Sequence, residues 1–476
     1  KGTTNHGGTP SLAINTQDTL YIINFGNNGP NGCAADLQFY TTSVDSIHEA
    51  FKGSGYGALQ IQALNSVRFR TDGTGATGPS GGNGWDATSN GNDIYVLSDA
   101  GNISTQKLNI KSDNVSGKGH GYINFLAAGL NIPNGCSPGS RNSGLGSIYF
   151  NDEVKIERTA ATSTQTNIIA QNHIRTAKFT STNPNVDTTN ILSRMGDIWL
   201  GYSVTTPTID PSSDNSTTNG KSADDNVFTY NGTGTTGQLN IMAGWDDSHT
   251  TMTTSQGMEG GNVYFTHLTA NMAAANKHNA TIAIPYSSEY ICGATADESL
   301  YNRKNSYQAY EHSGIIGGVG ACGVDPKWTT YAGQLEDGTN PATAHDTSLV
   351  YHGNEGNLIL DAGRRGNIIM NRGAQIEFQD KTGNATFRTR HGDIDMRDPV
   401  DVEKMKGSLL FLAQIADITK LSNIGVCGCD EERNNVYLQD FKYTATGNSG
   451  SVFIGADNNI KLNYGGLANI GTRQDP

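Results

Sequence analysis

A five-residue pattern constrains this chain more than any other feature: glycine, any residue, a large aliphatic residue or phenylalanine, any residue, and again a large aliphatic residue or phenylalanine. Eleven copies occur, where about three are expected by chance at this composition. They start at Gly57, Gly121, Gly146, Gly196, Gly237, Gly261, Gly356, Gly366, Gly392, Gly407 and Gly450. The alternation places both large residues on one face of a strand, and the leading glycine permits the positive φ of a tight corner. Each copy therefore predicts a corner followed by a strand.

The spacing of the copies indicates a larger repeat. Several gaps between neighbouring copies are 25, 50, 24 and 26 residues, and others, of 41, 43, 64 and 95 residues, indicate inserted loops. A coil of about 25 residues with two or three short strands can stack on the next coil, so that each strand pairs above and below. The pattern therefore predicts an all-β chain folded as a parallel β-helix, or β-solenoid, with irregular inserted loops.

Composition excludes several other classes of protein. The 476 residues include 59 glycines, and 35% are hydrophobic and 16% charged. Interior glycines destabilise helices by up to about 1 kcal/mol each, so a helical bundle is excluded, while the charge is too low for a disordered chain. A net charge of −13 disfavours binding to nucleic acid phosphates. No run of 18 apolar residues occurs, so we expect no insertion into a membrane.

Longer internal matches support the repeat. Residues 121–132 align without gaps on residues 407–418, and the sequence Pro-Asn-Gly-Cys occurs at both 30–33 and 133–136. A helix beginning near Pro399 is an alternative for residues 399–421, but the alignment favours a strand within 407–418.

One stretch resembles a known family. Gly356-Asn-Leu-Ile-Leu-Asp-Ala-Gly363, Gly366-Asn-Ile-Ile-Met370 and Gly392-Asp-Ile-Asp-Met396 are similar to the Gly-Asn/Asp-Ile-x-Leu-x-Ala-Gly repeats of filamentous haemagglutinin-type adhesins. The resemblance implies a right-handed β-helix, export from a bacterium and attachment at the cell surface.

Three regions follow from the distribution of the repeat. Residues 1–265 are predicted to form coils with Gly/Asn-rich loops, 266–355 an insertion without a copy of the repeat, and 356–476 coils again. The insertion contains the aromatic residues Tyr286, Tyr290, Tyr301, Tyr307, Tyr310, Trp328 and Tyr331. Aromatic side chains on a projecting loop can stack on sugar rings, or they can pack a small core of the loop itself. These residues are the candidate binding site.

The six cysteines fit the disulfides of an exported protein. They are Cys33, Cys136, Cys292, Cys322, Cys427 and Cys429. Cys33 with Cys136 and Cys292 with Cys322 are the tentative pairs. A bond within Cys427-Gly-Cys429 would be strained, so a metal, partners elsewhere and free thiols all stay open for these two residues.

Motifs for catalysis or metal binding are weak. Gly119-His-Gly121 and Asp246-Asp247 resemble two pieces of the polygalacturonase signature, but their order is reversed and no Arg-Ile-Lys follows. We therefore expect His120 to end a loop and the two aspartates to cap a turn, and we name no catalytic residue. Gly81-Gly-Asn-Gly-Trp-Asp86 fits one calcium nonapeptide, which normally needs consecutive copies. Asp86 is a weak calcium candidate, and no other metal or cofactor is predicted.

These features predict an extracellular structural protein of a bacterial surface, acting as an adhesin or a fibre component. A self-assembling head-to-tail filament subunit is the main alternative, because the open ends of a solenoid expose unpaired strand edges. A β-helix enzyme that degrades polysaccharides and a viral tail spike are further alternatives. The expected partners are other copies of the chain, or glycans and proteins of a host or neighbouring cell.

Overall fold

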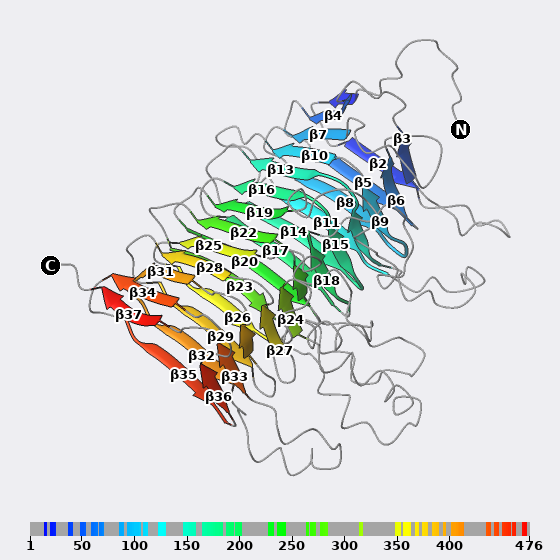
Figure 1. The fold of residues 1–476 in the computed structure, drawn as a ribbon. Helices are drawn as coiled ribbons and strands as arrows, with labels where there is room; N and C mark the ends of the chain where they lie inside the picture. The colour runs from blue at the N-terminus through cyan, green and yellow to red at the C-terminus, as the bar shows by residue number, and fades with distance from the viewer. Residues whose placement is uncertain are drawn as a thin grey trace, which may run out of the picture.

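The computed structural model describes the strands of the chain and several turns between them (Figure 1). The described residues are 14–16, 20–24, 37–40, 48–53, 59–64, 66–70, 85–89, 93–105, 108–112, 122–129, 146–158, 164–183, 187–194, 196–201, 227–232, 236–243, 263–265, 267–272, 277–283, 314–317, 348–353, 356–362, 367–370, 374–378, 383–389, 394–396, 401–413, 435–438, 442–446, 450–457, 459–462 and 469–473. Within these ranges the protein is all-β, without a helix. No element of the described part is therefore a helix that could cross a membrane.

The described strands form three long parallel sheets, and the chain visits the sheets in turn (Figure 1). We call them sheets A, B and C, and we call three consecutive strands, one from each sheet in that order, a coil.

Sheet A contains β1 (Ile14–Thr16), β4 (His48–Gly53), β7 (Trp85–Ser89), β10 (Leu108–Ser112), β13 (Val154–Arg158), β16 (Phe179–Asn183), β19 (Val227–Gly232), β22 (His267–Met272), β25 (Ser348–Gly353), β28 (Ala374–Phe378), β31 (Asp401–Met405), β34 (Lys442–Thr446) and β37 (Asn469–Arg473). Sheet B contains β2 (Leu20–Asn24), β5 (Leu59–Ala63), β8 (Ile94–Ser98), β11 (Ile123–Ala127), β14 (Thr164–Ala170), β17 (Asp187–Ser193), β20 (Thr236–Ala243), β23 (Lys277–Ala283), β26 (Leu358–Asp361), β29 (Ala385–Thr389), β32 (Leu409–Ala413) and β35 (Val452–Ala456). Sheet C contains β3 (Leu37–Tyr40), β6 (Val67–Arg70), β9 (Ile103–Thr105), β12 (Ile148–Phe150), β15 (Ile174–Thr176), β18 (Ile198–Leu200), β21 (Val263–Phe265), β24 (Gly314–Gly317), β27 (Asn367–Met370), β30 (Ile394–Met396), β33 (Val436–Leu438) and β36 (Ile460–Leu462).

Each strand pairs with the strands three places before and after it, so equivalent residues of successive coils lie in rows. In sheet B, for example, Phe125 of β11 pairs with Ile168 of β14, which pairs with Ile191 of β17. Strands alternate buried and partly exposed residues, as in β5 and β8. A period of two gives each sheet one inner and one outer face.

The inner faces of the three sheets share one hydrophobic core. Phe125 of sheet B meets Phe150 of sheet C edge-on, with ring centroids 5.3 Å apart. Phe150 stacks on Phe179 of sheet A at 6.1 Å, and Phe179 stacks on Phe228 of the next coil at 4.8 Å. The core therefore runs both across a coil and from one coil to the next.

The predicted strands are confirmed where the sequence pattern placed them. All eleven copies of the pattern precede or open a strand, six in sheet B and five in sheet C among the described strands.

Residues 409–413 form β32, at the position in sheet B that the alignment with 121–132 predicted, and the alternative helix is wrong there. Within the predicted insertion, 266–355, strands β22 to β25 take regular places in the three sheets; the bounds predicted for the three regions stay a prediction.

The leading glycine of the pattern was explained from the sequence by a positive φ. This explanation is confirmed at one corner and wrong at others. Gly146 has a φ of +80°, the left-handed conformation that glycine tolerates. Gly196, Gly407 and Gly450 do not have positive φ. At these corners a side chain is excluded by space instead, since a Cβ on Gly407 or on Gly450 would lie 2.0 Å from a carbonyl oxygen of the coil before.

Candidate interaction site beside sheet C

The long connections between the described strands all lead into or out of one sheet. Connections of more than 12 residues between the described strands all begin or end at a strand of sheet C. They comprise residues 71–84, 128–147, 201–226, 244–262, 284–313, 318–347 and 414–435. No connection from sheet A to sheet B is longer than ten residues, the length of 113–122. Four of the seven join sheet B to sheet C and three join sheet C to sheet A, so sheet C is common to all of them.

The predicted binding residues belong to two of these connections. Tyr286, Tyr290, Tyr301, Tyr307 and Tyr310 fall between β23 and β24, and Trp328 and Tyr331 fall between β24 and β25. All seven lie outside the described residues, so their role as a binding site stays a prediction.

All six cysteines also fall in connections that begin or end at sheet C, and all lie outside the described residues. Cys33 belongs to the β2–β3 connection, Cys136 to β11–β12, Cys292 to β23–β24, Cys322 to β24–β25, and Cys427 and Cys429 to β32–β33. Their pairing stays a prediction. His120 and Asp246-Asp247 likewise fall outside the described ranges.

The outer face of sheet C carries large side chains at its centre. Tyr149, Arg175 and Trp199 are the middle residues of β12, β15 and β18, and they pair in register across three coils. Their neighbours in each strand line the core, so these three side chains point outward. Arg175 and Trp199 are nevertheless only 5% and 3% exposed. This part of the outer face is thus covered, unlike a typical solvent-facing row.

Ring contacts join these residues to the corner that precedes them. The Arg175 guanidinium carbon lies 5.3 Å from the centre of the Tyr149 ring, a cation–π distance. The His173 and Trp199 rings are 5.1 Å apart and tilted by 55°. We call Ser147, Tyr149, His173, Arg175, Asp197 and Trp199 the sheet C cluster.

His173 is held as a neutral acceptor in this cluster. Its backbone N–H donates to Ser147 Oγ at 3.2 Å, and its Nδ1 accepts the backbone N–H of Asp197 at 3.0 Å. Burial, together with the positive charge of Arg175, lowers the pKa of His173 from 6.5 to about 4. The imidazole is therefore uncharged at neutral pH, which the hydrogen bond to Nδ1 requires.

Tyr149 is kept protonated by the same surroundings. Burial raises the pKa of its phenol, although a hydrogen bond with Ser147 and the charge of Arg175 act in the opposite direction. The cluster thus combines the cationic Arg175 and the acidic residue Asp197 with neutral aromatic rings. Because Arg175, Asp197 and Trp199 are at most 7% exposed, this chemistry suits packing against other side chains of the protein.

The corner residues form a ladder that the sequence analysis missed. The side chain of each corner residue accepts the backbone N–H of the equivalent residue in the next coil, from Ser66 through Asn102, Ser147 and His173 to Asp197. Asn357, Asn384, Ser408 and Ser451 repeat this arrangement before sheet B. The second position of the pattern was treated as any residue, although eight of the eleven copies have Asn, Asp or Ser there. That bias was the available signal.

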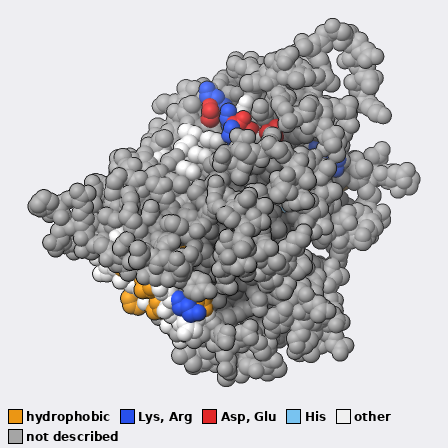
Figure 2. All heavy atoms as spheres, viewed as in Figure 1, with side chains coloured by type: hydrophobic (Ala, Val, Ile, Leu, Met, Phe, Trp, Pro, Cys, Tyr) orange, Lys and Arg blue, Asp and Glu red, His pale blue; other side chains and the backbone are white. Residues whose placement is uncertain are grey.

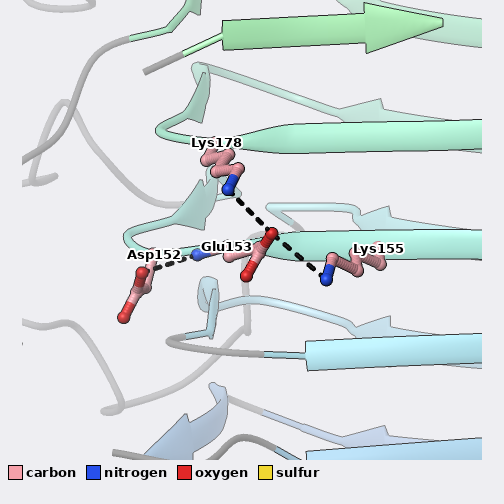
Figure 3. A network of polar contacts seen from close by, with 4 residues as sticks. All are labelled: Asp152, Glu153, Lys155 and Lys178. Atoms are coloured by element: carbon pink, nitrogen blue, oxygen red, sulfur yellow. Dashed lines mark hydrogen bonds and ion pairs between the residues drawn. The ribbon is translucent and has the colours of Figure 1, made fainter. Parts of the chain in front are cut away.

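A charged network lies at the corner between sheets C and A (Figure 3). Glu153 Oε1 accepts ion pairs from Lys155 of its own coil at 3.3 Å and from Lys178 of the next coil at 3.1 Å. The Glu153 backbone N–H donates to Asp152 Oδ1 at 2.8 Å. Burial alone would raise the pKa of Glu153, but the two lysines outweigh it and lower the pKa. The network links neighbouring coils and requires no ligand.

Metal-binding chemistry finds no support in the described part of the chain, where no three His, Cys, Asp or Glu residues form a group able to hold an ion. Asp86 lies in β7, in register with Asn109 of β10, and its side chain is outside what the structure describes. Its assignment as a calcium ligand stays a prediction.

No protein-family model, no curated protein and no solved structure matches this chain. The resemblance to filamentous haemagglutinin-type adhesins stays a prediction from the short repeats alone.

Proposed function

We propose that the protein is a right-handed parallel β-solenoid of a bacterial cell surface, and that it acts as an adhesin that displays binding segments along one side. The observation that carries the proposal is that every long connection between the described strands begins or ends at a strand of sheet C. Sheets A and B then supply a rigid support, because their strands are joined to each other only by short turns. Binding residues commonly lie on loops held by such a scaffold.

One argument supports the solenoid and a second supports its right hand. The chain passes through sheets A, B and C in constant order with parallel pairing throughout, which is how a solenoid of either hand is built. Crossover connections between parallel strands are right-handed in about 98% of cases. An experimental density map would test this form, and a left-handed path would contradict it.

The adhesin role is tested by replacing one connection at a time in the full chain. One variant has residues 286–311, and another has residues 320–345, exchanged for a short Gly/Ser linker. The matched control has the same exchange at 203–224, which belongs to another long connection. We expect the first two variants to bind glycan arrays and cell surfaces at least about tenfold more weakly, a loss of about 1.4 kcal/mol. The circular dichroism spectrum and melting temperature should stay near those of the wild type. Unchanged binding by both variants would contradict the proposed binding segments.

A filament subunit is a second candidate, favoured by the last described coil. Ile460 and Leu462 pair in register with Val436 and Leu438, which are fully buried, yet they are 45% and 42% exposed themselves. Figure 2 shows hydrophobic side chains gathered at the place of β35 and β36. Core positions open to solvent in this way fit the edge of another coil, which in a filament belongs to the next copy.

The number of strands in each sheet leads to a specific test of the filament. Sheet A has 13 described strands, while sheets B and C have 12 each. If β35 and β36 pair with β2 and β3 of the next copy, β37 and the next β1 compete for one position in sheet A. Removal of 469–476 should therefore tighten end-to-end association, whereas Ile460→Glu with Leu462→Glu should abolish it. Sedimentation velocity over a concentration series measures both, and a wild type without end-to-end assemblies would refute this candidate.

A further inference from the structure

Two central rows of the outer face of sheet B are almost free of charge. Charged residues lie beside these rows: Tyr95 Oη donates to Asp93 Oδ2 at 2.9 Å, and Gln62 Nε2 donates to Asp99 Oδ1 at 3.0 Å. Two outward positions on each strand of sheet B form these two continuous rows across the described coils. The first row is Tyr21, Gln60, Tyr95, Asn124, Asn167, Asn190, Asn240, Thr281, Ile359, Thr386, Leu410 and Phe453, and the second is Ile23, Gln62, Leu97, Leu126, Ile169, Leu192, Met242, Ala283, Asp361, Arg388, Leu412 and Gly455. Asp361 and Arg388 are the two charged residues among these positions. They neutralise each other, because Arg388 donates from Nε to Asp361 Oδ2 at 3.1 Å and also from Nη2.

The outward rows of sheet A contain more charged residues than those of sheet B. The equivalent outward rows between β7 and β34 contain eight charged residues at 20 positions, against two at 24 positions in the two rows of sheet B. The eight in sheet A are Asp86, Lys111, Lys155, Glu157, Glu377, Asp401, Glu403 and Lys442. Depletion of charge at the centre of a surface is the compositional mark of a protein–protein interface.

The second row of sheet B contains an aliphatic stripe over five successive coils. The stripe is Leu97, Leu126, Ile169, Leu192 and Met242. All five are at least partly exposed, and Leu126 is 36% exposed. Burying such a row against a partner contributes roughly 25 cal/mol for each Å² of apolar surface removed from water.

An asparagine ladder lies beside the stripe. Asn167 donates to Asn124, Asn190 to Asn167, and Asn240 to Asn190, each from Nδ2 to Oδ1 at 2.8 Å. Three hydrogen bonds thus join four amides, while Asn240 Oδ1, at the end of the ladder, is buried without a hydrogen-bond partner. A partner that covers the ladder leaves these three bonds in place, so the cost of desolvation falls on the amide groups outside them.

The face is large enough for a stable contact. Twelve strands spaced about 4.8 Å apart give a length of roughly 57 Å, and two rows of outward side chains give a width of roughly 14 Å. The area is roughly 800 Å², which equals the contribution of one partner to a standard protein–protein interface. No connection between described strands of sheets A and B exceeds ten residues, whereas four connections from sheet B to sheet C, 128–147, 244–262, 284–313 and 414–435, are longer.

We propose that the outer face of sheet B is a lateral interface between two copies of this chain, related by a two-fold axis in the plane of contact. A chain of net charge −13 repels its own copies, so a contact between copies is favoured along two rows whose only charged residues, Asp361 and Arg388, cancel each other. The two rows run along the whole described length of sheet B, and a two-fold axis brings identical surfaces together. The partner is thus a copy of the same shape and periodicity. This inference does not depend on adhesion.

The oligomeric state of the full chain tests the proposal. Light scattering coupled to size exclusion and sedimentation equilibrium should give twice the chain mass at about 10 μM, a concentration at which a micromolar dimer is well populated. Leu126→Lys with Ile169→Lys places two charges in the centre of the stripe and should raise the dissociation constant at least about 100-fold. Thr180→Lys with Thr229→Lys adds the same charges on adjacent coils of sheet A and is the matched control.

Each outcome decides the proposal. Dimers of the wild type and of the control, with monomers of the sheet B variant that retain the wild-type melting temperature, support it. A wild type that stays monomeric up to about 100 μM overturns it. Equal weakening by both double variants also overturns it, because the effect would then come from net charge. A wild-type dimer that is dissociated by Ile460→Glu and Leu462→Glu would place the contact at the end of the molecule and likewise overturn it.

Discussion

At the scale of the residue, the corner glycines are fixed by the contact between coils. A Cβ on Gly407 would lie 2.0 Å from the carbonyl oxygen of Gly383, so Gly407→Ala must push two coils apart. We expect a loss of about 1–3 kcal/mol or more in the free energy of unfolding, the usual cost of overpacking. The midpoint of urea unfolding measures it. Thr386→Ala, an outward substitution on β29, is the control and should change stability by less than about 0.5 kcal/mol.

A second prediction at this scale concerns His173, whose pKa in the folded protein is about 4. Since the pKa is lowered in the folded state, the stabilisation is complete above pH 6.5 and is lost as the pH falls from about 6.5 to about 4. The shift corresponds to roughly 3 kcal/mol. His173→Asn keeps an acceptor for the Asp197 N–H, as Asn102 does for the Ser147 N–H two positions earlier in the ladder, but cannot titrate. Stability measured from pH 7 to pH 4 should fall less steeply in the variant, and identical slopes would disprove the prediction.

At the scale of the element, the stacked phenylalanines join strands of sheets A and C. Phe179 of β16 contacts Phe150 and Phe228 on its two sides. Phe179→Ala removes the central ring and leaves a cavity, so we expect a loss of about 3–5 kcal/mol in the free energy of unfolding. Thr180→Ala, the outward neighbour in the same strand, is the control. Chemical denaturation of both variants measures the difference, and equal midpoints would show that the core relaxes around the cavity.

The sequence predicted strands of two sheets and gave no signal for the third. Copies of the pattern precede strands of sheets B and C, where the chain turns sharply and a glycine relieves crowding. Strands of sheet A follow corners of a different kind, such as Ala177-Lys178 before β16, which keep their side chains. The sheet C cluster was also missed, because Tyr149, Arg175 and Trp199 occupy positions that alternation assigns to solvent. Burial of an outward residue depends on what covers it, which no periodicity within a strand records.

At the scale of the whole molecule, the two proposed self-contacts change its dimensions differently. Twelve coils spaced about 4.8 Å apart give a rod of roughly 57 Å for the described part. Association through the outer face of sheet B doubles the cross-section at constant length, whereas association through β35 and β36 adds a full length at constant cross-section. Small-angle X-ray scattering separates the cross-sectional radius from the overall radius of gyration. With lateral pairing, Leu126→Lys with Ile169→Lys should reduce the cross-sectional radius to that of one rod, and a variant that shortens the particle without thinning it would contradict the lateral arrangement.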